Sequence, residues 1–253
     1  MTRHHRRLGL LMLLLVATPV LALAASPDWT PFARVLDRHV RVDGGSTWVD
    51  YKALRSDPDF MRSVLLIGDT RMPDTASRDE RLAFYINAYN ILTMKVVADN
   101  WPVDSIRDVG NLLQPVWKMP AGRVGGRTVS LDDIEHGVIR PLGDPRIHFA
   151  IVCASRSCPD LRREPYTALQ LSSQLDDQVR RFLADPRKGL DVRLGAVRAS
   201  RIFAWFEEDF AKAGGPLPFI RRYRPDVPEG RQFQPDLVYD WSVNGPPTVR
   251  SGG

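Results

Sequence analysis

Apolar side chains recur at helical spacing in several stretches of the chain, most strongly over Ser77–Asn100. Ser77 and Glu80 have the spacing of a capping box, so the pattern predicts a helix that begins here. Apolar residues cover nearly its whole circumference, which is typical of a central, buried helix. Asn87 and Asn90 lie on one side of it, and as buried amides they must find hydrogen-bond partners on neighbouring elements.

Weaker patterns predict the elements around this helix. We expect further helices at 27–42, 57–67, 131–142, 167–184, 202–213 and 218–223, with a short one ending near Tyr51. Extended segments are expected at 114–130 and 191–200 as hairpins, at 146–153 as a buried strand, and at 237–241. Helices mixed with short, mostly hairpin-linked strands predict an α+β fold: a single domain with a central buried helix, surrounding helices and a small, mainly antiparallel sheet.

The first residues have the three-part pattern of a secretory signal peptide. A basic start is followed by an apolar stretch over 8–16 and by a small-x-small end at Ala22 and Ala24. The pattern predicts a leader at 1–24, cleaved after Ala24, and a periplasmic or secreted mature protein. The alternative is an uncleaved membrane anchor over 8–25, which Pro19 disfavours. The remaining residues, 25–253, fit one domain, with a C-terminal tail at 245–253 that we expect to be disordered.

Removal of the leader changes the charge and the histidine inventory. The formal net charge of the whole chain is +5, and it falls to +2 without Arg3, Arg6 and Arg7. With no long basic run left, nucleic-acid binding has no support, and no other apolar stretch is long enough to span a membrane. The imidazoles left after leader removal are His39, His136 and His148.

Several standard active-site motifs are absent from the sequence. It contains no nucleotide-binding glycine loop, no zinc-binding His-Glu-x-x-His helix and no Gly-x-Ser-x-Gly elbow, so no cofactor is expected. His39 is best explained as a packing residue with one hydrogen bond. Side chains alternate along a strand, so His148 and Cys153 should face opposite sides of the predicted strand. His136 is therefore the better imidazole partner for Cys153.

Glu135 and the two cysteines are the other candidate groups. Glu135 falls within the apolar stripe of the helix predicted at 131–142, where a carboxylate must be paired or protonated. It could orient an imidazole, act as a general acid or base, or accept hydrogen bonds from a loop. Cys153 and Cys158 are separated by four residues, and in an oxidising compartment such a pair is most often a disulfide.

Three blocks resemble the signatures of the domain-of-unknown-function 547 family. They are Phe84–Asn90, Ser130–His136 and Asp144–Pro159; Ser200–Phe210 and Tyr239–Asn244 are similar to its C-terminal motifs. The resemblance runs from about Trp29 to Asn244 and implies an exported bacterial member of this family. It implies no settled activity, but it directs attention to Asn87, Asn90, Glu135, His136 and Cys153. In the family's plant relatives the first cysteine of the last block tends to persist without the second, which implies a role for Cys153 beyond a disulfide.

These observations leave two functions open. The first is a thiol-dependent hydrolase or acyl-transferase, with Cys153 as nucleophile, His136 as base, and Glu135 or Asn87 orienting the imidazole. Here we expect Asn90, Arg156 and His148 to contact a small-molecule or peptide ligand. The second is a non-enzymatic envelope protein that binds a ligand or partner and carries a Cys153–Cys158 disulfide. A redox dithiol and a zinc site of His136, His148 and the two cysteines rank lower.

Overall fold

The computed structural model describes residues 27–192 and 195–246. The leader predicted at 1–24 and most of the tail predicted at 245–253 lie outside the described residues. Among the residues it covers, no helix combines the length and the apolar character needed to cross a membrane.

The N-terminal elements are a helix, a hairpin and two further helices. Helix α1 spans Thr30–His39, and the chain then forms a β-hairpin of β1, Val40–Asp43, and β2, Ser46–Val49. The helix predicted over 27–42 therefore ends early, because Gly44 and Gly45 adopt positive φ angles and turn the chain back. Helix α2, Tyr51–Leu54, and helix α3, Pro58–Asp69, follow.

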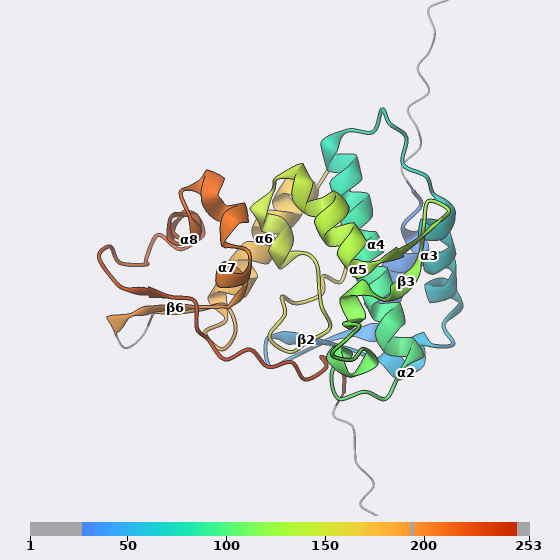
Figure 1. Cartoon of the computed structure of the whole chain (residues 1–253), viewed down its shortest axis with the longest axis horizontal. Helices are drawn as coiled ribbons and strands as arrows, with labels where there is room; N and C mark the ends of the chain where they lie inside the picture. Colours follow the sequence, from blue (N-terminus) through green and yellow to red (C-terminus); the bar gives the residue numbers. More distant parts are fainter. Residues whose placement is uncertain (1–26, 193–194, 247–253) are drawn as a thin grey trace, which may run out of the picture.

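Helix α4, Arg78–Asp99, is the centre of the molecule (Figure 1). Ser77 and Glu80 form the predicted capping box, and most of the side chains of α4 are buried on all sides. Helices α2 and α3, strand β3 (Pro120–Val124) and helix α5 (Leu131–Ile134) pack around it. The prediction of a central, buried helix is confirmed.

The segment after α4 leads through two 3₁₀ turns, η1 (Ile106–Val109) and η2 (Val116–Lys118), into the hairpin of β3 and β4 (Arg127–Ser130). Ser130 caps α5 as predicted. The helix predicted at 131–142 is not uniform: α5 passes into a π-helix, η3 (Glu135–Ile139), and then a 3₁₀ turn, η4 (Arg140–Leu142). Such π-turns occur frequently at functional sites.

The strand predicted at 146–153 is wrong. The chain forms a 3₁₀ helix, η5 (Pro145–Phe149), whose start is fixed by the Asp144 side chain accepting from Arg146 N–H at 3.1 Å. Beyond it, Asn90 of α4 donates to the Ala150 carbonyl at 3.0 Å and accepts from Val152 N–H at 2.9 Å. The buried backbone thus finds its partners on a side chain of α4, so no neighbouring strand is needed.

The C-terminal elements form a second group. They are α6 (Leu171–Ala184), β5 (Leu190–Asp191), β6 (Val197–Ala199), α7 (Ile202–Trp205), the 3₁₀ helix η7 (Glu207–Ala213), α8 (Pro216–Tyr223) and β7 (Phe233–Gln234). β5 and β6 are antiparallel, and β6 and β7 are parallel. The strand predicted at 237–241 is also wrong, because this segment is irregular and crosses back toward β2, where Asn244 C=O accepts from Val49 N–H at 2.8 Å.

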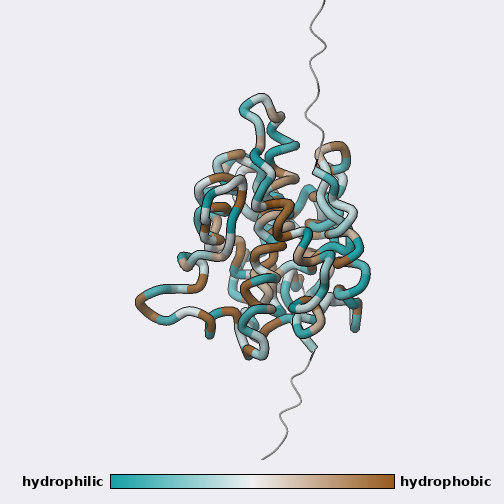
Figure 2. Tube along the Cα trace, turned by 90° about the vertical axis from the view of Figure 1, so that its right-hand side faces the viewer, coloured by the Kyte–Doolittle hydropathy of each residue, from teal (hydrophilic) through white to brown (hydrophobic). Residues whose placement is uncertain are grey.

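The core has two parts, and the fold class is α+β as predicted. One hydrophobic cluster surrounds α4, and the other is built from Phe149, α6, α7, η7 and α8. The two groups lie at opposite ends of the molecule in Figure 1, and Figure 2 shows hydrophobic segments running through the interior. Phe149 belongs to the second cluster and its neighbours Ile147 and Ala150 to the first, so the 145–153 segment joins the two.

Candidate functional site

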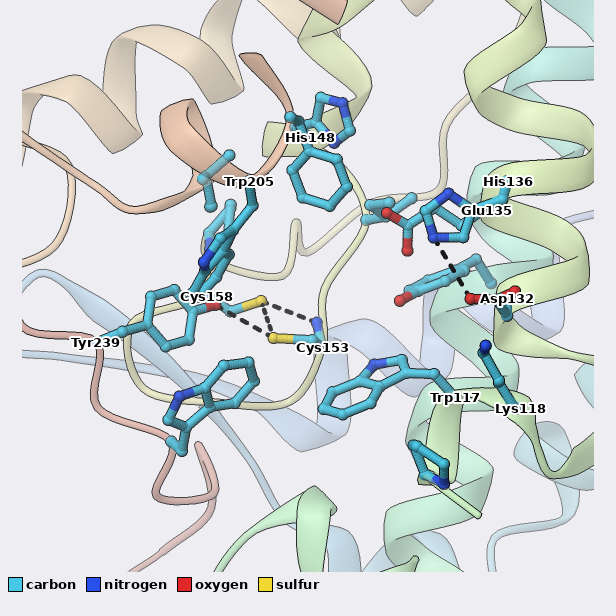
Figure 3. A pocket seen from close by; sticks show the side chains of 17 residues that line it. Trp117, Lys118, Asp132, Glu135, His136, His148, Cys153, Cys158, Trp205 and Tyr239 are labelled. Carbon is cyan, nitrogen blue, oxygen red and sulfur yellow. Dashed lines mark hydrogen bonds and ion pairs between the residues drawn. The ribbon is translucent and has the colours of Figure 1, made fainter. Parts of the chain in front are cut away.

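A pocket of about 330 Å³ lies where the two clusters meet. Its walls are mostly aromatic and come from both groups of elements: Trp117, Trp205, Phe206, Tyr239 and Trp241. Polar groups occupy its opposite ends (Figure 3), with the two cysteine sulfurs at one end and Glu135, His136 and Asp132 at the other. A concave, mainly apolar pocket with a few convergent polar groups is the usual form of a small-molecule site.

The backbone around Cys153 is held in an unusual conformation. Ala154 has a φ of 60°, in the left-handed region that non-glycine residues rarely occupy. Its carbonyl accepts from Asn244 N–H at 2.9 Å, and Asn90 fixes the chain just before Cys153. Strain of this kind persists only where surrounding contacts over-determine it, and it concentrates at functional sites.

The Cys153 sulfur is surrounded by groups that can donate hydrogen bonds. It lies 2.6 Å from Cys158 Sγ, 3.2 Å from Ser155 Oγ and 3.3 Å from Tyr239 Oη. The hydrogen bond from Cys158, helped by those from Ser155 and Tyr239, outweighs burial and lowers the pKa of Cys153 to about 6. Donors around the sulfur favour its charged form, which is the condition that a nucleophilic cysteine needs.

Cys158 is buried beside Cys153 and also lines the pocket, and both cysteines are free thiols in the structure. The Cys158 sulfur also accepts from Cys153 N–H at 2.9 Å. Burial and the nearby Cys153 sulfur raise the pKa of Cys158 well above its ordinary value. The sequence-predicted pair is therefore brought together, although no disulfide joins the two sulfurs.

Glu135 lies at the start of the π-turn with its carboxyl group facing the pocket (Figure 3). It is only 8% exposed, and burial raises its pKa to about 7, although a hydrogen bond from the Tyr89 hydroxyl opposes this rise. The negative charge of Cys153 raises the pKa further. Glu135 can therefore exchange a proton near neutral pH, which is the property a general acid or base needs.

His136 lines the pocket but lies at its exposed edge. Its side chain is 42% exposed, with Nδ1 2.7 Å from Arg140 and Nε2 3.4 Å from Asp132. None of the hydrogen bonds found among the described residues joins His136 to Cys153. The predicted imidazole–thiol pair is thus replaced by a His136–Arg140–Asp132 cluster.

The structure corrects the predicted placement of His148. Because 146–153 is not a strand, His148 and Cys153 do not face opposite sides of a sheet, and both line the pocket. His148 Nε2 lies 2.6 Å from Asp209, and its ring stacks on Phe206 at 4.0 Å. Burial lowers the pKa of His148, so the neutral ring donates to Asp209, which also accepts two hydrogen bonds from Arg140.

The remaining predicted residues lie outside the pocket. The Asn87 amide donates to the Tyr166 carbonyl at 2.8 Å and accepts from Tyr166 N–H at 2.9 Å, and it makes no hydrogen bond to His136 among the described residues. Asn90 acts through the backbone before Cys153 and is not among the pocket-lining residues. Arg156 lines a separate, more polar cavity of about 440 Å³. His39 packs as expected, with one bond of 2.7 Å to Asp57.

Within the described part of the chain, no group of three or more His, Cys, Asp or Glu side chains could hold a metal ion. The zinc site considered from the sequence therefore has no support in the structure.

Several residues of the site have no role that the sequence predicted. Tyr89, which lines the pocket, and Ser155, which contacts the Cys153 sulfur, lie in the blocks that resemble the family signatures, as do most of the aromatic residues of the walls. The sequence feature that could have indicated the aromatic wall residues is the density of aromatic side chains in Ser200–Phe210 and Tyr239–Asn244. These segments come close to Cys153 only in the tertiary fold. Trp117 carried no such signal.

Residues 73–183 match the model of a family described as "Protein of unknown function, DUF547". The matched region holds α4, the π-turn and both cysteines, and it supports the resemblance drawn from the sequence motifs. The aromatic residues of α7 and of the C-terminal segment lie beyond it. No curated protein and no solved structure matches the chain.

Proposed function

We propose that the protein is an exported thiol-dependent hydrolase or acyl-transferase in which Cys153 is the nucleophile. The observation that carries this proposal is the ring of donors around the Cys153 sulfur inside an aromatic pocket. A thiolate held in this way needs no adjacent base to activate it, which accounts for the absence of a His136 contact.

Glu135 takes the proton-transfer role in this scheme. The Cys153 thiolate attacks an acyl carbonyl, and the bond to the leaving group breaks as that group takes the proton of the Glu135 carboxyl. The resulting thioester is attacked by water or by an acceptor hydroxyl or amine. This nucleophile gives its proton to the Glu135 carboxylate, and Cys153 leaves as a thiolate. A carboxyl group with a pKa of about 7 suits both half-reactions.

The walls of the pocket favour an apolar, flat substrate. Trp117, Trp205 and Trp241 line the pocket and supply aromatic surface for a planar or acyl group. At the exposed edge, Lys118, Asp132 and His136 can contact a polar end of the same molecule.

A chromogenic aryl ester, p-nitrophenyl acetate, tests this proposal directly. We expect a burst of one nitrophenolate per molecule and an acetyl group mapped to Cys153 by mass spectrometry. Cys153→Ala should abolish the burst, and Glu135→Gln should slow turnover of the thioester. The unfolded protein is the control, because its cysteines react as ordinary thiols. Acetylation no faster in the folded protein than in the unfolded one would reject the nucleophile.

The alternative is a non-enzymatic ligand- or partner-binding protein with a Cys153–Cys158 disulfide. The 2.6 Å separation of the sulfurs favours it. Alkylation of the protein in its native compartment, before cell disruption, separates the two. Free Cys153 supports the enzyme, whereas a permanent disulfide in every molecule supports the binding protein.

Export rests on the leader pattern at 1–24 and is tested separately. The mature protein recovered from the periplasm or medium should begin at Ala25 when its N-terminal peptide is sequenced. A protein that retains its first residues inside the cell would contradict this localisation.

A further inference from the structure

The two sulfurs of the pocket differ in accessibility. Cys153 is half-buried, whereas Cys158 is only 4% exposed, and both line the pocket. The sulfurs are only 2.6 Å apart (Figure 3), so a group bound to Cys153 is within reach of Cys158. An acyl enzyme needs a nucleophile but does not need a second thiol in contact with it.

We infer that Cys153 and Cys158 form a dithiol centre that reduces a small disulfide bound in the aromatic pocket. Cys153 is the attacking thiol and Cys158 the resolving thiol. The inference rests on the proposed nucleophilic role of Cys153 and adds a second activity to the same site.

The reaction balances without any further oxidant. The Cys153 thiolate attacks one sulfur of the bound disulfide, forming a mixed disulfide and releasing the other half as a thiolate. Cys158 loses its proton to that thiolate and attacks the Cys153 sulfur, which releases the second half. The substrate gains two electrons and leaves as one thiol and one thiolate, the thiolate takes a proton from water, and Cys153 and Cys158 are left joined by a disulfide.

The charge of Cys153 explains why Cys153 attacks the substrate first and Cys158 attacks the mixed disulfide second. While Cys153 is a thiolate, its negative charge helps to keep the pKa of Cys158 high. In the mixed disulfide this charge is gone, so Cys158 ionises more readily at the moment when it must attack. The resolving thiol therefore stays protonated until it is needed.

The pocket limits the substrate class. A volume of about 330 Å³ with aromatic walls admits a small disulfide with flat or apolar flanks, and it excludes a disulfide buried in a folded protein.

Dithiodipyridine, a neutral aromatic disulfide that releases a coloured thiopyridone, is a suitable probe. The full mature protein is first reduced and freed of reductant. We expect the wild type to release two thiopyridones per molecule, to keep no adduct, and to yield a Cys153–Cys158 disulfide on peptide mapping. Cys158→Ser, which keeps a hydroxyl donor beside Cys153, should release one and retain a thiopyridyl adduct on Cys153. Because resolution is intramolecular, the wild-type adduct should stay below about a tenth of that in the variant.

The outcomes separate this inference from the proposed function. Wild type that stops at a stable Cys153 adduct, or that carries an adduct on each cysteine, overturns the dithiol centre but leaves Cys153 as a nucleophile. Release no faster than from unfolded protein overturns both. If Cys158→Ser fails to fold, the stoichiometry of thiopyridone release and adduct formation in the wild type decides between these outcomes.

Discussion

The Cys153 sulfur shows how local contacts reverse the effect of burial. Burial alone would raise the pKa of a thiol, because it disfavours the thiolate. Hydrogen bonds from Cys158, Ser155 and Tyr239 act in the other direction and dominate. Glu135 is also buried but has fewer hydrogen-bond donors, and its pKa is raised, so burial sets the direction of the shift at Glu135 and hydrogen bonds set it at Cys153. Of these residues, the sequence pointed to Cys153 and Glu135, because a cysteine and a carboxylate on an apolar stripe can be recognised from the sequence alone.

Glu135 should make the stability of the protein depend on pH. Its pKa is about 7 in the folded state against an ordinary value of 4.5, so between these values the folded state holds a proton that the unfolded chain has lost. The contribution of Glu135 to the free energy of unfolding should therefore fall as pH rises from about 4.5 to 7 and change little above that. The full effect is about 3 kcal/mol.

Glu135→Gln keeps an acceptor for Tyr89 and removes the titration. In urea unfolding at about pH 5 and pH 8, wild type should lose roughly 2–3 kcal/mol more than the variant over this interval. Parallel pH profiles for the two proteins would show that Glu135 does not titrate in this range.

At the scale of elements, the amphipathic helices and hairpins were predictable, and the segment that carries Cys153 was not. Periodicity identifies α3 and α6 because each buries a regular face, and α4 is recognised by its capping box and its nearly continuous apolar surface. Residues 146–153 are apolar and buried, which is equally compatible with a strand. Their conformation is decided by the Asn90 amide, a contact 60 residues away in sequence. The π-turn at Glu135 has no periodic signal either.

Asn90 and Asn87 form a matched pair that tests whether the Asn90 amide determines the conformation of the segment that carries Cys153. Each amide makes two buried backbone bonds, Asn90 to the 150–152 segment and Asn87 to Tyr166. Asn90→Leu and Asn87→Leu should each cost roughly 2–5 kcal/mol of unfolding free energy, since two buried backbone groups lose their partners. Only Asn90→Leu should slow alkylation of Cys153 by iodoacetamide in the folded state. Equal effects of both variants on the alkylation rate would mean that Asn90 does not position the thiol.

At the scale of the whole molecule, the pocket exists because two hydrophobic clusters meet. Arg140 and His148 both bind Asp209 of η7, so one carboxylate ties the α4 side to the C-terminal elements. His148 and Arg140 hold the pKa of Asp209 well below its usual range, which keeps it ionised. The sequence could predict a single α+β domain and the residue types of a thiol site. It could not predict this meeting of surfaces, because the segments that meet are far apart in the chain.

Asp209→Asn should weaken the junction between the clusters. Arg140 would lose its ion-pair partner, and we expect a loss of roughly 2–3 kcal/mol in urea unfolding. Asp226→Asn is the control, since the exposed Asp226–Arg224 pair should contribute less than about 1 kcal/mol. If the two variants lose the same small amount, Asp209 does not hold the clusters together.

The proposed nucleophile requires Cys153 to be ionised at neutral pH, and the pH dependence of its alkylation measures this ionisation. Reduced, folded protein is treated with iodoacetamide over a range of pH, and the rate at Cys153 is followed by peptide mass spectrometry. The rate should rise with a midpoint near the pKa of about 6. A midpoint at or above about 8.5, the value of an ordinary cysteine, would contradict a thiolate at neutral pH and with it the nucleophile.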